Sequence, residues 1–379
     1  MSVVLWVSLA LIVYIYAGYP LAAAVLGRLI PRRVASGPYE PTVTIVIAAF
    51  NEADVIASTL ENKLALEYPP ELLEILVVSD GSEDGTDAIV QRFATERVRL
   101  IRQEPRAGKT SALNLGVQHV RSEIVVFSDA NSIYRVDALR NLVRGFADPR
   151  VGYVTGKMLY GTGPGDWVGS GCSAFMKYEN FLRVQETRLG SVVGVDGGID
   201  AVRRALYLPM RSDQLPDFVL PLSVVEQGYR VVFEPDAIVV EDALSKGSDE
   251  YRMRVRVALR AFWALWDKRS LFNPFRRPLF AWQLLSHKLL RYLALVPMLT
   301  AFAANLILAS KGPVYAVLLL LQLLVWAGAL FGLTPAARMI PIGIVRWTSY
   351  LLLLNVASLH AFLRFMLGKK QVLWTPRKG

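Results

Sequence analysis

Two short acidic turns carry the residue types that hold a charged ligand. Asp80 begins an Asp-Gly-Ser turn after the run ILVVS, and Asp129 begins an Asp-Ala-Asn turn, ending at Asn131, after the run IVVFS. Both runs are nearly all apolar, as in parallel strands buried on both faces, and a ligand crevice lies where such strands end. Spacing alone leaves a second interpretation open, in which each aspartate only begins a turn or caps a helix.

The chemistry of these turns favours a divalent cation. An acidic crevice repels a nucleotide diphosphate unless a metal ion lies between the carboxylates and the phosphates. Asp129 and Asn131 offer oxygen ligands two residues apart, which suit Mg²⁺ or Mn²⁺. The sequence therefore predicts a metal-assisted phosphate site at the Asp129 turn.

Alternating β-branched runs and helical stretches begin after Pro41 and predict an α/β fold with a mainly parallel, Rossmann-like sheet and crossover helices. The stretch from 193 to about 242 is predicted as a Gly-rich turn followed by a mixed region. The expected strands are Thr42–Ala48, Glu74–Ser79, Val98–Arg102, Glu123–Ser128 and Val151–Thr155. The expected helices are 52–66, 85–95, 110–120 and 136–146.

An apolar segment without charged side chains runs from Val3 to Gly27. It is long enough to cross the roughly 30 Å hydrocarbon core of a bilayer. No Lys or Arg precedes it, whereas Arg28, Arg32 and Arg33 follow it. These flanks favour a retained anchor over a cleaved signal peptide, and they place the downstream chain in the cytoplasm.

The composition agrees with a membrane protein. Hydrophobic residues make up 53% of the chain and charged residues 20%, and the mean hydropathy is +0.36. The net charge of +10 comes from basic residues gathered beside apolar segments, which an anionic lipid surface explains without nucleic acid as a partner. The single cysteine, Cys172, excludes an internal disulfide and agrees with a reducing compartment.

The C-terminal third predicts helices on and in a membrane. Residues 249–268 form a basic amphipathic pattern, and Leu271–Lys288 has the aromatic and basic residues of an interfacial helix. With an external N-terminus, four crossings leave the basic tail outside, against the positive-inside rule. A last segment broken or re-entrant around Arg346, or a tail that breaks the rule, are both left open. The three further spans expected are Leu289–Ser310, Val314–Leu333 and about Pro341–Met366.

Six motifs in order resemble the membrane-bound branch of glycosyltransferase family 2, whose relatives include cellulose, chitin and hyaluronan synthases. The resemblance covers roughly Pro41 to Arg260 and continues into the membrane helices. It implies a GT-A catalytic domain and a single in-line displacement that inverts the anomeric centre. The motifs are TIVIAAFNEADVI, VVSDGSEDGT, GKTSALNLGV, VVFSDANSIY, GGIDAVRRALY and PDFVLPLSVVEQGYRVVFEP.

The resemblance assigns roles residue by residue. Asp129 and Asn131 match the Asp-x-Asp metal motif, with Asn as a weaker second ligand. Asp217 matches the last residue of the motif that supplies the catalytic base, and Pro216 stands where relatives usually have another acid. From the residues alone, a helix cap is the alternative for Asp217. The implied donor-binding residues are Phe50, Asn51, Glu52 and Asp80 at the uridine end, with Lys109 near the donor.

The arginine-rich helix departs from polymerising relatives. Residues 253–257 stand where those relatives carry Gln-x-x-Arg-Trp, and here Arg256 is retained for the diphosphate while the Gln and Trp are absent. Contact with anionic lipid is the alternative explanation for Arg252 and Arg260. The acceptor-side candidates are Phe218, Arg254 and Trp263, although a membrane-interface belt is the favoured role for the tryptophan.

These observations predict an inverting transferase of cell-surface carbohydrate synthesis, a multi-pass protein of the cytoplasmic membrane whose catalytic domain faces the cytoplasm. It moves a sugar from a UDP-sugar to a lipid or polysaccharide acceptor. The alternatives are a non-catalytic nucleotide-sugar-binding scaffold, motivated by Asn131 and Pro216, and a processive synthase with its own channel. The expected segments are an anchor (1–33), the GT-A domain (41–245), amphipathic and interfacial helices (246–288), about three membrane helices (289–367) and a basic tail (368–379).

Overall fold

Four strands near the N-terminal side of the catalytic region form the parallel half of one sheet. In the computed structural model, which describes all residues except 162–166, 243–246, 335–342 and 372–379, β1 pairs in parallel with β2 and β4, and β2 with β3. The predicted parallel strands are thus confirmed to within a residue or two at each end. Their bounds are β1 Val43–Ala49, β2 Leu73–Ser79, β3 Val98–Arg102 and β4 Ile124–Asp129.

The second half of the sheet is mixed. The full order is β3-β2-β1-β4-β7-β6-β8-β5, in which β7 runs antiparallel to both β4 and β6, β6 runs parallel to β8, and β5 runs antiparallel to β8. The sequence predicted only the beginning of β6. The region expected to be a turn and mixed structure contains two strands instead. The bounds are β5 Ile133–Tyr134, β6 Val151–Gly161, β7 Ile199–Arg203 and β8 Arg230–Asp242.

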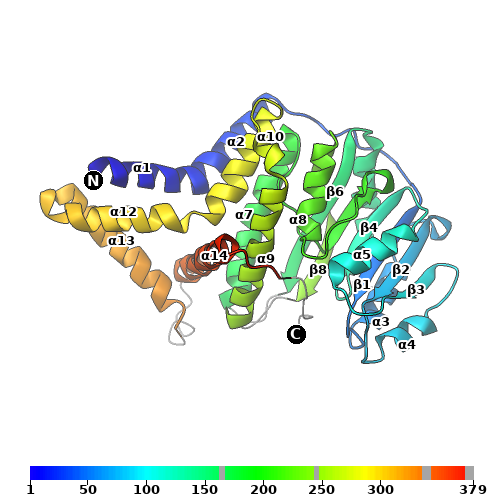
Figure 1. Cartoon of the computed structure of the whole chain (residues 1–379). Coiled ribbons are helices and arrows are strands. Elements are labelled where there is room, and N and C mark those ends of the chain that lie inside the picture. Colours follow the sequence, from blue (N-terminus) through cyan, green and yellow to red (C-terminus); the bar gives the residue numbers. More distant parts are fainter. Residues whose placement is uncertain (162–166, 243–246, 335–342, 372–379) are drawn as a thin grey trace.

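Helices cover both faces of the sheet (Figure 1). Successive side chains of a strand point to opposite faces, so Ile45 and Ile47 of β1 join one apolar core while Val46 joins the other. The first core is closed by α3 Ile56–Leu64, α4 Thr86–Arg92 and α6 Ala138–Val143. The second core is closed by α5 Lys109–Gln118 and α8 Pro216–Glu226.

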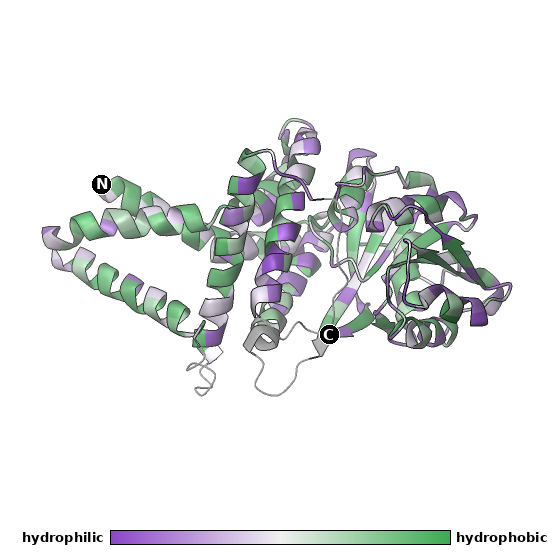
Figure 2. Ribbon diagram, turned by 60° about the horizontal axis from the view of Figure 1, so that its bottom comes forward, coloured by the Kyte–Doolittle hydropathy of each residue, from purple (hydrophilic) through white to green (hydrophobic). Residues whose placement is uncertain are grey.

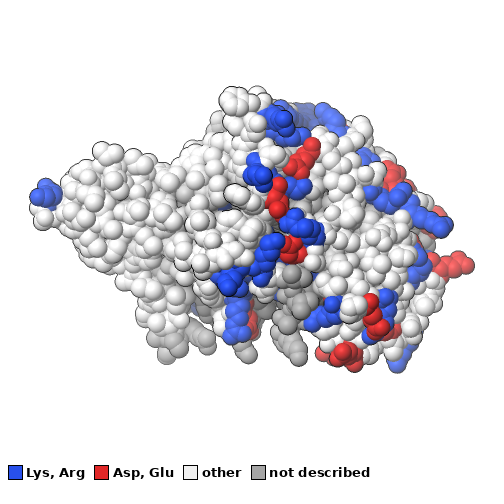
Figure 3. All heavy atoms as spheres, viewed as in Figure 1, with Lys and Arg blue, Asp and Glu red and all other residues white. Residues whose placement is uncertain are grey.

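Away from the sheet, the helices form an apolar bundle. Three of them are long and apolar enough to cross a membrane, Ser2–Leu29, Pro313–Phe331 and Gly343–Met366, and a bent pair ending at Lys311 makes up to four among the described residues. Figure 2 shows these helices as mostly hydrophobic, and Figure 3 shows almost no charge over α1, α12 and α13. The bundle comprises α1 Ser2–Val13, η1 Tyr14–Gly18, α2 Tyr19–Leu29, α12 Leu295–Leu308, α13 Pro313–Phe331 and α14 Gly343–Met366.

A layer of helices lies between the sheet and the bundle (Figure 1). It contains α7 Trp167–Leu189, α9 Gly247–Asp267, α10 Pro278–Gln283, η6 Leu284–Leu289 and the short α11 Leu290–Tyr292. The helix predicted at 249–268 is confirmed as α9, whereas the predicted helix over 271–288 is divided between α10 and η6. In Figure 3, Lys and Arg side chains gather in a band over this layer.

The C-terminal end of α14 contacts the catalytic region. α14 packs along α9 and α7, and just beyond its end Lys370 Nζ makes an ion pair of 2.6 Å with Asp213. Trp263 Nε1 of α9 donates to the Lys369 carbonyl at 2.9 Å. The start of the basic tail therefore lies on the same side of the bundle as the sheet, and residues 372–379 of that tail are outside the described part.

Candidate active site

A cavity of about 310 Å³ lies where β1, β4, α5, α8 and α9 meet. The carboxyl ends of β1 and β4 supply one wall, and the first turn of α8 and the middle of α9 supply the others. The fold thus brings together side chains from opposite ends of the catalytic region. The sequence-predicted residues that line it are Glu52, Lys109, Asp129, Asn131, Asp217, Phe218, Arg254 and Arg256.

The turn that carries Asp129 and Asn131 is held from behind by α3. Thr59 Oγ1 donates to the carbonyl of Ala130 at 2.6 Å, and the buried ammonium of Lys63 donates to the carbonyl of Ser132 at 2.6 Å. These two bonds satisfy carbonyls on either side of Asn131. The backbone is thereby fixed with Asp129 and Asn131 facing the cavity.

Lys109 interacts with Asp129, in the turn that also carries Asn131, and with the predicted base, Asp217. It is the first residue of α5, and its Nζ makes an ion pair of 2.5 Å with Asp129 Oδ1. Burial alone would lower the pKa of this ammonium, but the charges of Asp129 and Asp217 outweigh burial and hold the pKa above its usual range. The two carboxylates and the lysine therefore form one electrostatic unit.

The oxygen donors present fit a divalent cation that binds together with a diphosphate. No group of three or more His, Cys, Asp or Glu that could hold a metal occurs among the described residues. Asp129 and Asn131 nevertheless present a carboxylate and an amide oxygen to the cavity. Mg²⁺ and similar hard cations are commonly held by one or two protein oxygens and completed by substrate phosphates.

Glu52 adds a third oxygen donor with unusual titration. Its backbone N–H donates to Thr86 Oγ1 at 2.9 Å, which fixes it at the end of β1. Burial, followed by the charges of Asp129 and Asp84, raises the pKa of Glu52 to about 7. The carboxyl is therefore partly protonated near neutral pH.

This titration predicts a stability effect in the metal-free protein. Because the folded pKa lies above the unfolded value of about 4.3, the folded state binds more protons between these values, and wild-type stability falls as pH rises through that window. Glu52→Gln removes this loss. We expect it to match wild type near pH 4 and to be more stable by about 1–2 kcal/mol near pH 8, a range reduced for solvent screening.

The measurement is urea unfolding in EDTA at both pH values. Glu61→Gln serves as the matched control, because Glu61 is an exposed carboxylate on α3. The free energy of unfolding of this variant should equal that of wild type at both pH values. If the difference in unfolding free energy between Glu52→Gln and wild type were the same at both pH values, the Glu52 carboxyl would have an ordinary pKa.

Asp217 is positioned by a helix start and by a glycine. Pro216 is the first residue of α8, where its fixed φ suits the helix and its missing N–H costs nothing, so Asp217 falls in the first turn. Gly197 packs directly against it, because a Cβ at Gly197 would lie 2.5 Å from Asp217 Cγ. Gly197 also has φ +87, a conformation that favours glycine.

Asp200, a buried carboxyl, lies beside the predicted base Asp217. Asp200 of β7 and Asp217 line the same small pocket at the foot of the site. Burial, followed by the charge of Asp217, raises the pKa of Asp200 to about 8. Asp200 therefore keeps its proton at neutral pH.

Arg260 corrects one sequence-based interpretation. Contact with anionic lipid was the alternative explanation for Arg260, but the residue is buried and donates to Thr110 Oγ1 at 3.2 Å and to the Gln214 carbonyl. It thus ties the turn before α8 to the start of α5. Burial lowers the pKa of Arg260 to about 10, against the opposing charge of Asp217. Its role in the structure is to fix the position of the Asp217 turn.

Of the residues predicted to hold the nucleoside, Glu52 lines the cavity, whereas Phe50, Asn51 and Asp80 lie beside it. The Arg106 guanidinium stacks over the Phe50 ring at 3.5 Å. Asp80 is buried, and its carboxylate accepts from Gln103 Nε2 at 2.6 Å and from the N–H groups of Ala107 and Gly108, both at 2.8 Å. Asp80 therefore shapes the loop that leads into α5.

Asn51 completes this turn with a positive φ of 53°. Its Oδ1 accepts from the Glu83 N–H at 2.8 Å, and its own N–H donates to Ser82 Oγ at 3.1 Å. The turns after β1 and β2 are thereby joined into one surface. Phe50, Asn51 and Asp80 belong to that surface.

Trp263 is not brought to the site. It packs against Phe365 of α14 with ring centroids 4.7 Å apart, and its indole donates to the Lys369 carbonyl. It is absent from the residues that line the cavity. Among the three acceptor-side candidates, Phe218 and Arg254 do line the cavity, whereas Trp263 holds α14 against α9.

Sequence reasoning missed a charged cluster at the far end of the cavity. Glu179 of α7 accepts from His287 Nε2 at 3.3 Å and from Arg291 Nη1, and it lies 3.8 Å from Lys288 Nζ. His287 was expected to be interfacial, but it is buried. The available signal was the presence of His287, Lys288 and Arg291 in a stretch that leads into an apolar segment, since charges there mark functional sites.

Comparison with known proteins agrees with this geometry. The sequence profile of glycosyl transferase family 2 matches residues 44–207. A poly-beta-1,6-N-acetyl-D-glucosamine synthase of Staphylococcus aureus is 37% identical over 117 residues, which are 30% of this chain and 28% of the relative. A beta-monoglucosyldiacylglycerol synthase of Trichormus variabilis is 31% identical over 168 residues, which are 43% of this chain and 36% of the relative. The chain thus spans about a third of the length of these curated relatives.

One solved structure resembles the whole chain. A mannosyltransferase from Pyrobaculum calidifontis, solved in complex with GDP-Man and Mn²⁺, superposes with a TM-score of 0.71 and 27% sequence identity. The superposition covers 97% of this chain and 99% of that chain. The similarity therefore includes the helical bundle as well as the sheet.

Proposed function

The chain carries a glycosyltransferase family 2 domain at residues 44–207 with a GT-A fold, and on this basis we propose that it transfers a sugar, with inversion, from a nucleotide-sugar to an acceptor presented at a membrane. The observation that carries the proposal is the single cavity lined by Lys109, Asp129, Asn131, Asp217 and Arg256. It combines phosphate-binding cations, oxygen donors for a metal, and a carboxylate base in one space.

The chemical step follows from these groups. An acceptor hydroxyl is a poor nucleophile at neutral pH, and a carboxylate within hydrogen-bond reach, Asp217, takes its proton as the hydroxyl oxygen bonds to the anomeric carbon. The bond from that carbon to the diphosphate breaks, and the nucleoside diphosphate leaves with the electron pair. Lys109 and Arg256 stabilise the negative charge that develops on the leaving group.

Asp129 and Asn131 would hold a divalent cation, Mn²⁺ or Mg²⁺, that binds together with the diphosphate. Such a cation would supply positive charge to the leaving group. Lys109 already contacts Asp129 and so keeps a positive charge beside this carboxylate. Glu52 is a further oxygen donor on the cavity wall.

The donor is proposed to be a UDP-sugar. Asp80 holds the loop at the nucleoside end through its buried carboxylate, and the resemblance to glycosyltransferase family 2 assigns this residue to a uridine donor. The similar mannosyltransferase was solved with GDP-Man, so a guanosine donor is the second candidate. The cation Arg106 stacked on Phe50 marks where a base ring would bind.

Membrane orientation is proposed from the charges at the helix ends. Arg28, Arg32 and Arg33 follow the first span, and Lys370 contacts Asp213 of the catalytic region. With crossings by α1–α2, α12 and α13, and with α14 packed along α9, both basic ends lie on the cytoplasmic side, as the positive-inside rule requires. The conflict found in the sequence arises only if all four candidate spans are counted as crossings.

A donor screen tests the proposed function. Protein purified in detergent is incubated with Mn²⁺ and a panel of UDP- and GDP-sugars, and the released nucleotide diphosphate is measured with and without a membrane lipid extract. We expect release from one donor class, stimulation by the extract, and loss of release with EDTA. Nucleotide binding without sugar release across the panel would instead identify a non-catalytic binding protein.

A further inference from the structure

The cavity does not end at the catalytic residues. Beyond Asp217 and Arg254 its wall is formed by Tyr16 of η1 and by Asn355 and Ser358 of α14. The Tyr16 hydroxyl donates to Asn355 Oδ1 at 3.0 Å and so joins the first span to α14. The site is thus continuous with helices of the proposed membrane bundle, which an acceptor with a lipid tail would contact.

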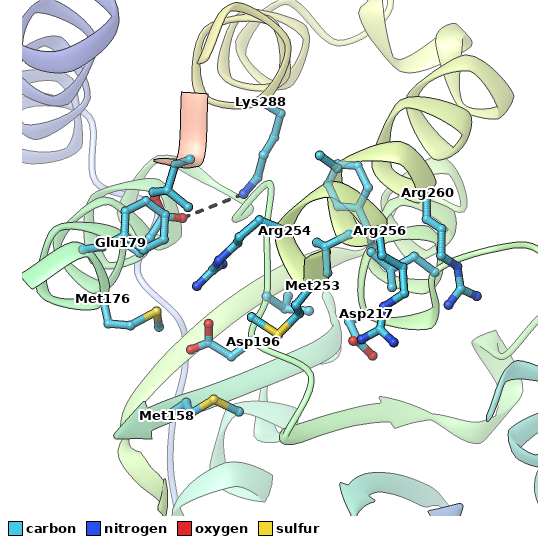
Figure 4. A pocket seen from close by; sticks show the side chains of 18 of the residues that line it. Met158, Met176, Glu179, Asp196, Asp217, Met253, Arg254, Arg256, Arg260 and Lys288 are labelled. Carbon is cyan, nitrogen blue, oxygen red and sulfur yellow. Dashed lines mark ion pairs between the residues drawn. The ribbon is translucent and has the colours of Figure 1, made fainter. Parts of the chain in front are cut away.

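Cationic side chains face this end of the cavity. Glu179 of α7 faces Lys288 (Figure 4) and makes an ion pair with Arg291. Arg291 and His287 hydrogen-bond to Glu179, whereas the Lys288 ammonium stays 3.8 Å away, beyond hydrogen-bond distance. Glu179 therefore faces two cationic side chains and hydrogen-bonds to only one of them.

The neighbouring carboxylates are already engaged. Glu186 accepts from the Tyr19 hydroxyl and from the Val193 N–H, and one of its oxygens lies 2.7 Å from His287 Nδ1. Asp196 forms an ion pair with Arg183 through both of its oxygens. Among the described residues, Glu179 is thus the carboxylate left to Lys288. The Lys288 side chain is partly buried, and its ammonium, with three N–H donors, lies 3.8 Å from Glu179, so an anion in the cavity would be a closer partner.

A short loop connects this lysine to the base. Lys288 Nζ lies against Gly194, where a Cβ would collide with it, and Asp217 lies against Gly197. Three residues span at most about 11 Å, so these two glycines are no farther apart than that. This separation is on the scale of one sugar ring plus a phosphate group.

The geometry points to an acceptor lipid whose hydroxyl-bearing head group is joined to its tail through a phosphate, with Lys288 as the phosphate anchor. This inference rests on the proposed transferase function. The head-group hydroxyl is placed at Asp217, the phosphate at Lys288 with Arg254 on the same cavity wall, and the tail between η1 and α14. The head-group hydroxyl bonds to the anomeric carbon, its proton passes to Asp217, and the nucleoside diphosphate leaves.

The first test compares acceptors. Phosphatidylcholine vesicles carry phosphatidylinositol, a polyprenyl-diphosphate sugar, or neutral glucosyl-diacylglycerol, and transfer of labelled sugar to lipid is measured with the donor that the wild type cleaves. We expect transfer to one or both phosphate-bearing lipids, and which one reacts identifies the source of the phosphate. We also expect micelles of that lipid, and not of the neutral one, to raise the melting temperature of the wild type.

The second test removes the charge. Lys288→Met should raise the acceptor KM for the phosphate-bearing lipid by about ten- to a hundredfold, as expected for loss of a charge-assisted bond. Lys288→Arg should restore most of the affinity. Arg276→Gln should keep the wild-type KM, because Arg276 is exposed just before α10 and does not line the cavity.

Three outcomes overturn the inference. Transfer to the neutral lipid with the same KM in wild type and Lys288→Met would assign the lysine a structural role. Donor cleavage without transfer to any of these lipids would reject the acceptor class and leave the transferase function standing. No donor cleavage at all would remove the proposed function and the inference with it. If Lys288→Met does not fold, the wild-type acceptor preference and melting temperatures decide.

Discussion

Asp217→Asn is expected to lower kcat for sugar transfer by about 10²- to 10⁴-fold, the usual contribution of a general base. The amide keeps the shape of the side chain but cannot take the acceptor proton. Asp217 lies in the first turn of α8 and faces the cavity beside Lys109 and Arg256. The measurement is the rate of labelled transfer at saturating donor and acceptor, with nucleotide binding measured in parallel.

The control separates catalysis from folding. Asp137→Asn alters a partly exposed aspartate that pairs with Arg135 and does not line the cavity, and it should transfer at the wild-type rate. Asp217→Asn should still bind nucleotide and unfold cooperatively. Full transfer by a folded Asp217→Asn would show that another group accepts the proton.

Gly197→Ala should also inactivate the enzyme, although Gly197 carries no chemistry. The new Cβ would lie 2.5 Å from Asp217 Cγ, so the carboxylate or the loop must move. A displacement of about 1 Å in a reacting group lowers a rate by about 10²-fold. The positive φ of 87° adds a backbone cost of about 1–2 kcal/mol to folding. Transfer rate and urea unfolding are measured on the same sample.

Gly228→Ala provides the matched control. Gly228 has φ +92, close to that of Gly197, but a Cβ there meets nothing within 4 Å. It should therefore show the backbone cost of about 1–2 kcal/mol without the catalytic loss. Equal kcat losses in both variants would mean that backbone strain, and not contact with Asp217, causes the effect.

The predictable part of the fold is the part in which local sequence and final environment agree. β1, β2 and β4 are short apolar runs because both of their faces are covered, and this burial is visible in the sequence. β7 and β8 carry charged residues, including Asp200 and Arg230, inside the strands. Their partners come from distant parts of the chain, so the local pattern does not predict them.

The same division applies to charged residues. Lys63 is buried with its ammonium on the Ser132 carbonyl, and His287 bridges Glu179 and Glu186. Such groups are stable inside a protein only with partners already in place. The identity of those partners is settled by packing between α3 and the sheet, and between α7 and η6.

Asp80, Asp129 and Asp217 show which features of the site can be predicted from the sequence and which cannot. By itself the sequence determined that Asp80 and Asp129 stand at strand ends, because the apolar runs before them are local and periodic. Only the tertiary structure decided that Asp80 shapes the loop before α5 and that Asp129 pairs with Lys109. It also placed Asp217 in the same cavity as Asp129 and Lys109. It also decided that this cavity reaches Lys288 and the apolar bundle. Contacts between residues distant in the chain depend on how helices pack on the sheet, and packing is a property of the whole fold.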